Sequence, residues 1–171
     1  MKRFLAGALL GLFLPPLVGL GAGRLGLIPV AATAEPSRWE AAIAAATLRA
    51  SLKRQAALEG RNPVPLTEEA LLAGLNAYRN DCAGCHGDFG HPSRWGTTGF
   101  YPRVPQFAEK PPDLPASQLF VVVKNGIRYS GMGAWGSLLS DDEIWRVVTF
   151  LSRLNSLPPR VETVWRNPPG P

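Results

Sequence analysis

Residues Cys82-Ala83-Gly84-Cys85-His86 form the stretch around which the rest of the chain is organised. Two thiols three residues apart can add to the two vinyl groups of a haem and hold it by thioether bonds. An imidazole directly after the second thiol then lies under the iron as the proximal ligand. Because Cys-x-x-Cys-His is the attachment pattern of c-type haem, the stretch predicts one covalent haem c, bound through Cys82 and Cys85, with His86 on the iron.

Three other interpretations of the two cysteines are weaker. A thioredoxin-like redox pair lies in a strand–helix–strand pattern, which the surrounding sequence lacks. A structural zinc site takes four Cys or His ligands, usually as two separated pairs. This chain has two Cys and two His, all between residues 82 and 91. A disulfide is the third alternative, but it explains neither His86 nor the methionine further along the chain.

The methionines of the chain supply the candidate for the second axial ligand. A thioether sulfur can cap the iron of electron-carrying haem proteins, and it raises the reduction potential. The chain has two Met, one of them the first residue, so Met132 is the only internal candidate. Gly131 and Gly133 let its backbone approach the iron without side-chain crowding. The rival, His91, lies five residues from His86 and would have to reach the opposite face of the haem. We therefore predict His86 and Met132 as the metal ligands.

Residues 67–157 resemble the class I cytochromes c, which are small helical monohaem electron carriers. The run Gly126–Met132 is similar to the methionine-ligand loop of membrane-anchored bacterial members. Gly74 and Tyr78 stand at the family's spacing before the haem motif, where a Gly and an aromatic residue cross the C-terminal helix. Phe150 matches the aromatic side chain that meets this Gly. The resemblance implies an all-α fold around one covalent haem, with the haem attached outside the cytoplasm.

The net charge of +5 is unevenly distributed along the chain. Residues 1–34 carry three basic side chains and no acidic one, residues 35–66 carry five basic and three acidic, and residues 67–171 carry ten of each. The high pI therefore belongs to the N-terminal segments, and it is no sign of nucleic-acid binding. We divide the chain into an anchor or signal segment (1–34), a stalk helix and linker (35–66), a cytochrome c domain (67–157) and a Pro-rich C-terminal tail (158–171).

The N-terminus predicts a membrane-spanning helix. Phe4–Gly23 is a run of 20 residues without a charge, and a helix of that length spans about 30 Å, the hydrocarbon thickness of a bilayer. A cleaved signal peptide is the alternative, because the run Ala32–Ala34 fits a cleavage site, although it lies well beyond the apolar run. Lys2 and Arg3 hold the N-terminus in the cytoplasm in both cases. We expect the haem domain in the periplasm, either tethered to the cytoplasmic membrane or soluble after cleavage near Ala34.

Ser37–Glu59 is predicted as a stalk helix. Ser37 and Glu40 have the spacing of a capping box, and the segment is rich in Ala, Leu and Arg. Its apolar face is expected to pack on the haem domain. Docking to a partner or to acidic lipid headgroups is the alternative. This face is formed by Trp39, Ile43, Ala46, Ala50 and Ala57.

Two helices of the haem domain have clear start signals. Thr67 is the expected N-cap of the first, and Ser140 with Glu143 forms a capping box for the last. Pro158 and Pro159 are expected to end this last helix. The tail beyond them is expected to lie irregularly over the surface, because it is rich in proline.

The stretch between the haem motif and Met132 is harder to assign. Val121–Val123 favours a strand, and Asn125-Gly126 favours a hairpin turn. The resemblance instead implies a short helix that ends at Gly126, and we adopt the helix. Phe89–Pro112 is rich in Gly and Pro, and we expect it to wrap around the edge of the cofactor as a loop.

Five further residues are assigned to the haem site. A metal-bound His usually donates its other ring N–H to a carbonyl or carboxylate, and in similar cytochromes a Pro carbonyl accepts it, which points to Pro105. Arg128 is a candidate partner for a haem propionate, with an ordinary solvated charge as the alternative. Aromatic side chains that could donate hydrogen bonds at the haem edge are Tyr101, Tyr129 and Trp135.

Together these features predict a membrane-tethered monohaem cytochrome c. We expect it to pass single electrons between redox partner proteins and to catalyse no reaction on a substrate. A haem enzyme such as a peroxidase is one alternative, but it needs an open iron position, which Met132 would close. The other alternative is a haem-bearing subunit of a larger membrane respiratory or dehydrogenase complex, with the stalk helix as its docking element.

Overall fold

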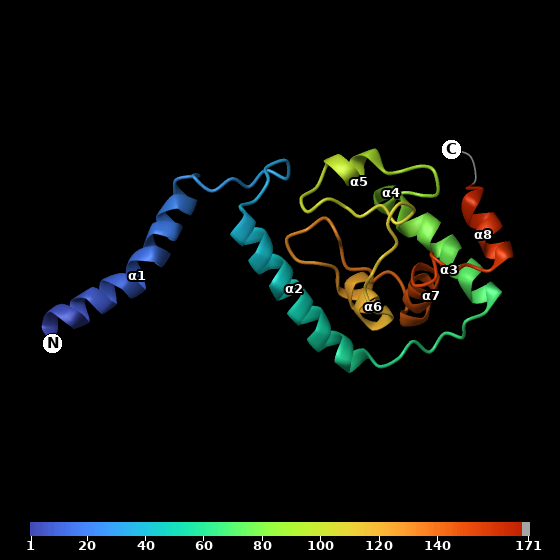
Figure 1. Ribbon diagram of the computed structural model, residues 1–171, viewed down its shortest axis with the longest axis horizontal. Coiled ribbons are helices and arrows are strands. Elements are labelled where there is room, and N and C mark those ends of the chain that lie inside the picture. Colours follow the sequence, from blue (N-terminus) through green and yellow to red (C-terminus); the bar gives the residue numbers. More distant parts are fainter. Residues whose placement is uncertain (169–171) are drawn as a thin grey trace. The chain divides into compact units, whose positions relative to one another are not determined.

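The computed structural model describes residues 1–168, and within them the regular structure is helical, with no strand. The chain forms two compact units, one over Met1–Ala34 and one from Glu35 onward. The all-α prediction is therefore confirmed (Figure 1). The helices are α1 (Lys2–Arg24), α2 (Arg38–Glu59), α3 (Glu68–Asp81), α4 (Ala83–His86), α5 (Arg94–Thr98), α6 (Ala116–Asn125), α7 (Asp141–Leu151) and α8 (Pro159–Arg166).

The first unit is built on α1. Residues Arg3–Arg24 are long and apolar enough to cross a membrane by length and composition. The helix runs through Pro15 and Pro16, which membrane helices tolerate better than soluble ones. A cleaved signal sequence can have the same length and composition.

The second unit is organised around the crossing of α3 and α7. Both helices begin at the predicted caps, since Thr67 accepts a hydrogen bond from a first-turn N–H and Ser140 forms a complete capping box with Glu143. Gly74 lies at the crossing, where an added Cβ would overlap the backbone carbonyl of Arg146 and lie 3.0 Å from Phe150 Cβ. The predicted close contact at Gly74 is confirmed.

Two apolar clusters flank this crossing. The first surrounds Tyr78, whose ring is fully buried and lies 5.7 Å from that of Phe150. The second joins α6 to α7 through Phe120 and Trp145, whose rings stack at 4.1 Å. The segment before Gly126 is thus a helix, as the resemblance implied, and it ends at this glycine because φ is 67° there, a region that favours glycine.

The α2 helix packs along α6 (Figure 1), but with a different face from the one predicted. Leu52 and Ala56 are buried against Val121, whereas Trp39 and Ile43 are 70 % and 59 % exposed. The prediction of the buried face was wrong because α2 carries a second stripe of small and apolar side chains at helical spacing. This stripe consists of Ala41, Ala45, Leu48, Leu52 and Ala56.

The C-terminal segment corrects two further predictions. The last predicted helix, α7, ends at Leu151, before the prolines, and Pro159–Arg166 form the helix α8 where an irregular tail was expected. Residues 169–171 of that tail lie outside the described residues. Pro159 suits the first turn of a helix, where its missing N–H has no partner to lose. Val161 and Trp165, four residues apart, are buried in the first cluster. Burial of each large apolar side chain is worth about 1.5–3 kcal/mol, enough to hold a short helix in place.

The segment expected to be a loop, Phe89–Pro112, contains one short helix, α5. Ser93 begins it, since the Ser93 hydroxyl accepts a hydrogen bond from Gly96 N. The rest of the segment is irregular, with one isolated bridge between Asp88 and His91 at its start.

Candidate functional site

The Cys-x-x-Cys-His stretch forms a single helical turn, α4, directly after α3. The backbone N–H groups of Cys85 and His86 both donate to the carbonyl of Cys82, at 3.1 Å and 2.9 Å. This turn places both thiols on the same side, because residues three apart are neighbours on a helix. Both thiols are free and half-buried. Burial raises the pKa of the Cys82 thiol to about 12, helped by the nearby carboxylate of Asp81. Cys82 is therefore protonated at neutral pH, which disfavours a thiol–disulfide exchange centre.

The His86 ring is held by two neighbours. Its Nδ1 lies 2.9 Å from the carbonyl oxygen of Pro105, and its ring stacks on that of Phe107 with centroids 4.4 Å apart and planes 7° from parallel. Burial lowers the pKa of His86, against the opposing effect of the Pro105 carbonyl. Because a carbonyl can only accept, Nδ1 carries the proton of the neutral ring and Nε2 keeps a lone pair, as iron ligation requires.

The five carbonyl groups of the motif and that of the following residue, Gly87, all accept hydrogen bonds. A helix end leaves its last carbonyls without helical partners, and here side chains and the following segment supply donors. The six acceptors and their donors are Cys82 O with His86 N (2.9 Å), Ala83 O with Gly87 N (2.8 Å), Gly84 O with Ser93 Oγ (2.7 Å), Cys85 O with Gln106 Nε2 (3.1 Å), His86 O with Phe107 N (3.2 Å) and Gly87 O with Tyr78 Oη (2.6 Å).

The loop that carries Met132 is closed by its own hydrogen bonds. Ile127 N donates to Met132 O at 2.9 Å, and the hydroxyl of Ser130 accepts from Met132 N at 3.1 Å. The Met132 side chain is half-buried against the second apolar cluster. A Cβ at Gly131 would overlap the ring of Phe100. The segment 89–112, which contains α5 and is called the α5 loop below, therefore touches the Met132 loop there.

The other predicted site residues lie in the same two loops. Tyr101 is half-buried in the α5 loop. Trp135 is half-buried against the second cluster, and its backbone N–H donates to the Val123 carbonyl at 3.0 Å. Arg128 is exposed, and Tyr129 is 93 % exposed with a φ of 61°. The roles assigned to these four side chains at the edge of a haem stay predictions.

Three residues that hold the motif were not assigned from the sequence: Ser93, Gln106 and Phe107. Ser93 and Gln106 donate to carbonyls of the motif, and Phe107 stacks on His86. The sequence held one signal for Phe107, its position two residues after Pro105. A chain that brings the Pro105 carbonyl to His86 also brings the next residues close to His86.

The donor set fits a haem better than a bare metal ion. Across residues 1–168, no group of three or more His, Cys, Asp or Glu side chains could hold an ion. A haem brings four ring nitrogens of its own, so one neutral imidazole and one thioether suffice to complete six-coordinate iron. The two free thiols on one turn suit thioether attachment.

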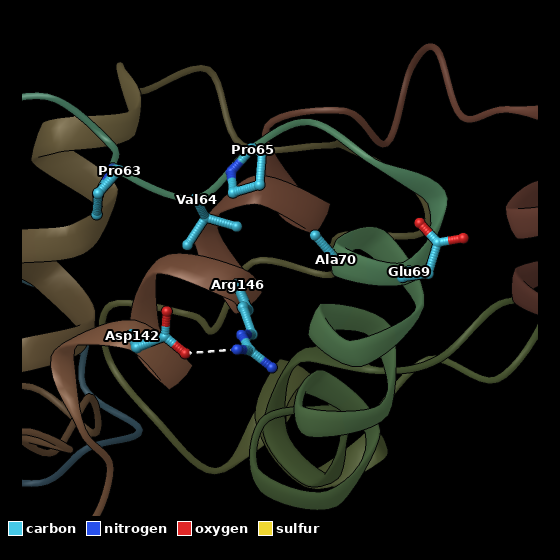
Figure 2. Close-up of a pocket in the computed structure, with 7 residues that line it drawn as sticks. All are labelled: Pro63, Val64, Pro65, Glu69, Ala70, Asp142 and Arg146. Atoms are coloured by element: carbon cyan, nitrogen blue, oxygen red, sulfur yellow. Dashed lines mark ion pairs between the residues drawn. The ribbon is translucent and has the colours of Figure 1, made fainter.

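A cavity of about 260 Å³ lies elsewhere, at the junction of the linker with α3 and α7 (Figure 2). Asp142 and Arg146 form an ion pair of 2.7 Å in its wall. Since none of the motif residues lines it, we assign it no part in cofactor binding. Its lining consists of Pro63, Val64, Pro65, Glu69, Ala70, Asp142 and Arg146.

Comparison with known proteins agrees with this arrangement. Residues 69–151 match the family model described as "Cytochrome C oxidase, cbb3-type, subunit III". The match begins in α3 and ends with α7, so it includes the motif turn and the Met132 loop and leaves out α1, α2 and α8. A search of the curated proteins finds no match.

Proposed function

We infer, from the class I c-type cytochrome domain that residues 69–151 form, that this chain carries single electrons at the outer face of the cytoplasmic membrane. The domain implies a covalent c-type haem and haem-based electron transfer. The observation that carries the finer proposal is the state of His86, a neutral ring fixed by the Pro105 carbonyl at 2.9 Å with Nε2 left as the iron donor.

Each functional side chain has a distinct role in this proposal. Cys82 and Cys85 would hold the haem by thioether bonds, and His86 and Met132 would bind its iron. When bound, the haem would supply one-electron redox chemistry at its iron. Met132, as a neutral soft ligand, favours the reduced state and raises the potential. The hydrogen bonds that close the loop around Met132 would keep its sulfur in place as an iron ligand and leave no open iron position for a substrate.

The location follows from the first unit. Lys2 and Arg3 are the first two residues of α1 and favour a cytoplasmic N-terminus, so α1 would place the haem domain in the periplasm, as a retained anchor. Donor and acceptor proteins on that side of the membrane are the expected partners.

A second candidate is a haem-bearing subunit of a larger membrane complex. The exposed Trp39 and Ile43 on α2 favour it, because large apolar side chains outside the core can serve as a docking surface. The matched family description itself names an oxidase subunit.

A redox titration of the purified full-length protein tests the electron-transfer role. We expect one haem per chain and a single transition with a slope of about 59 mV per tenfold change in the ratio of oxidised to reduced protein, as for a one-electron couple. The absorbance of the haem measures this ratio. Rapid binding of carbon monoxide by the reduced wild-type protein would reveal an open iron position and favour a haem enzyme.

Membrane fractionation tests the anchor. We expect the haem protein to remain with membranes in 1 M salt, to dissolve only in detergent, and to show an intact N-terminus by mass spectrometry, because α1 is held by the hydrophobic effect and salt does not weaken it. A matched variant with residues 1–34 replaced by a cleavable signal peptide should be soluble in the periplasm. A wild-type chain that starts at Glu35 in the soluble fraction contradicts the anchor. Elution of the detergent extract with other proteins would favour the subunit role.

A further inference from the structure

Two polar side chains are buried among the described residues, Gln106 with 7 % of its surface exposed and Thr149 with 5 %. Thr149 lies within α7, where its hydroxyl donates to the Trp145 carbonyl at 2.8 Å. Gln106 lies instead in irregular chain beside the haem motif. An amide costs free energy to bury unless its groups are hydrogen-bonded, so the partners of Gln106 show what it holds.

The Gln106 amide makes three hydrogen bonds to backbone groups. Its Nε2 donates to the carbonyls of Cys85 (3.1 Å) and Val104 (3.0 Å), and its Oε1 accepts from Ser93 N (2.7 Å). The orientation of the amide follows from these partners, because carbonyls only accept and a backbone N–H only donates. The side chain thereby ties together the motif turn, the start of α5 and its own segment.

Two glycines make room for this amide. A Cβ on Gly87 would lie 2.6 Å from Gln106 Oε1, and a Cβ on Gly96 would lie 3.2 Å from Gln106 Nε2. Gly87 also has a φ of 74°, which favours glycine. Space for the Gln106 side chain is therefore built into both segments that it joins.

The neighbours of Gln106 in the chain are the two residues that contact His86. Pro105 before it accepts the hydrogen bond from Nδ1 at 2.9 Å, and Phe107 after it stacks on the imidazole at 4.4 Å. Phe107 N also donates to the His86 carbonyl at 3.2 Å. An anchor at Gln106 therefore limits the movement of both contacts at once.

We propose that Gln106 is a positioning residue for the axial ligand: its buried amide fixes the Pro105 carbonyl against His86 Nδ1 and so tunes the reduction potential. The proposal rests on the proposed ligation by His86. A hydrogen bond from Nδ1–H to a well-placed acceptor makes Nε2 more basic. A more basic ligand favours ferric iron, so Gln106 lowers the potential, and its loss raises the potential.

The test replaces Gln106→Met in the full-length holoprotein, which keeps the length of the side chain and removes its donors and acceptor. We expect a higher reduction potential than the wild type in the redox titration. We also expect faster solvent exchange of the His86 Nδ1 proton, followed by NMR in the reduced, diamagnetic protein. Thr149→Val is the matched control, because it removes the hydroxyl of the other buried polar side chain far from the haem motif in sequence. It should lower the melting temperature and leave the potential and the exchange rate unchanged.

The outcomes separate the proposal from the proposed function. An unchanged potential and exchange rate in haem-bearing Gln106→Met, with a loss of stability like that of Thr149→Val, overturns the proposal alone. If Gln106→Met carries no haem, solvent exchange is measured in the wild-type protein instead. Slow exchange of the Gln106 amide protons and of the His86 Nδ1 proton supports the proposal, and fast exchange of either overturns it. A wild type without covalent haem overturns the proposed function and this proposal with it.

Discussion

Replacement of Cys82→Ser and Cys85→Ser together is expected to abolish covalent haem attachment. A serine hydroxyl occupies nearly the same space as a thiol but does not add to a haem vinyl group to form a stable thioether. The effect should be complete, because the two Cys of the motif are the only Cys in the chain. The measurement is extraction of the haem into acidic organic solvent from the variant and from the wild type.

The wild-type haem should stay with the denatured protein, and any haem bound by the double variant should extract. Each single variant is an internal control, since one remaining thioether still retains the haem covalently. Extraction of the haem from the wild type would end the c-type assignment of this site, whatever the other variants show.

Met132→Ala is expected to open the iron to small ligands, and Met132→His is expected to lower the potential. The first change removes the only internal thioether, so reduced protein should bind carbon monoxide. The second exchanges a soft neutral ligand for an imidazole, which favours ferric iron. The fall should be on the order of 0.1–0.3 V, a part of the roughly 0.8 V that axial ligands span. Absorbance spectra with carbon monoxide and a redox titration measure the two effects.

His91→Ala is the control for the axial assignment. His91 is exposed, and its backbone N–H donates to the Asp88 carbonyl at 3.0 Å in the isolated bridge. Loss of its ring should change neither the spectrum nor the potential. If His91→Ala opens the iron while Met132→Ala leaves the spectrum intact, the iron has two His ligands and the Met132 assignment is wrong.

The sequence predicted what local chemistry determines. The caps at Thr67 and Ser140 depend on neighbouring N–H groups, and the tight crossing at Gly74 follows from a residue without a side chain in mid-helix. The helix over 116–125 needed the resemblance, because a run of three valines in isolation favours a strand.

Other features depend on packing that no local pattern shows. The buried face of α2 was misassigned because two stripes of similar hydropathy run along that helix, and only contact with Val121 selects one. Likewise α8 is stabilised because the Trp165 side chain is buried in the first cluster and Arg79 Nη2 donates to the Trp165 carbonyl at 3.0 Å. Gln106 was missed because its partners are backbone groups, two of them in the distant segments of Cys85 and Ser93, and backbone groups carry no side-chain signature.

The six satisfied carbonyls from Cys82 to Gly87 have a kinetic consequence. When the charge on an iron changes by one unit, dipoles around it that are free to turn must reorient, and this reorganisation adds to the activation barrier. Dipoles already fixed by hydrogen bonds add little to that barrier, because no rearrangement is required at the moment of reaction. If His86 binds the iron as proposed, the protein on that side of the haem would reorganise little when the iron changes its charge, which would favour electron transfer at a small driving force.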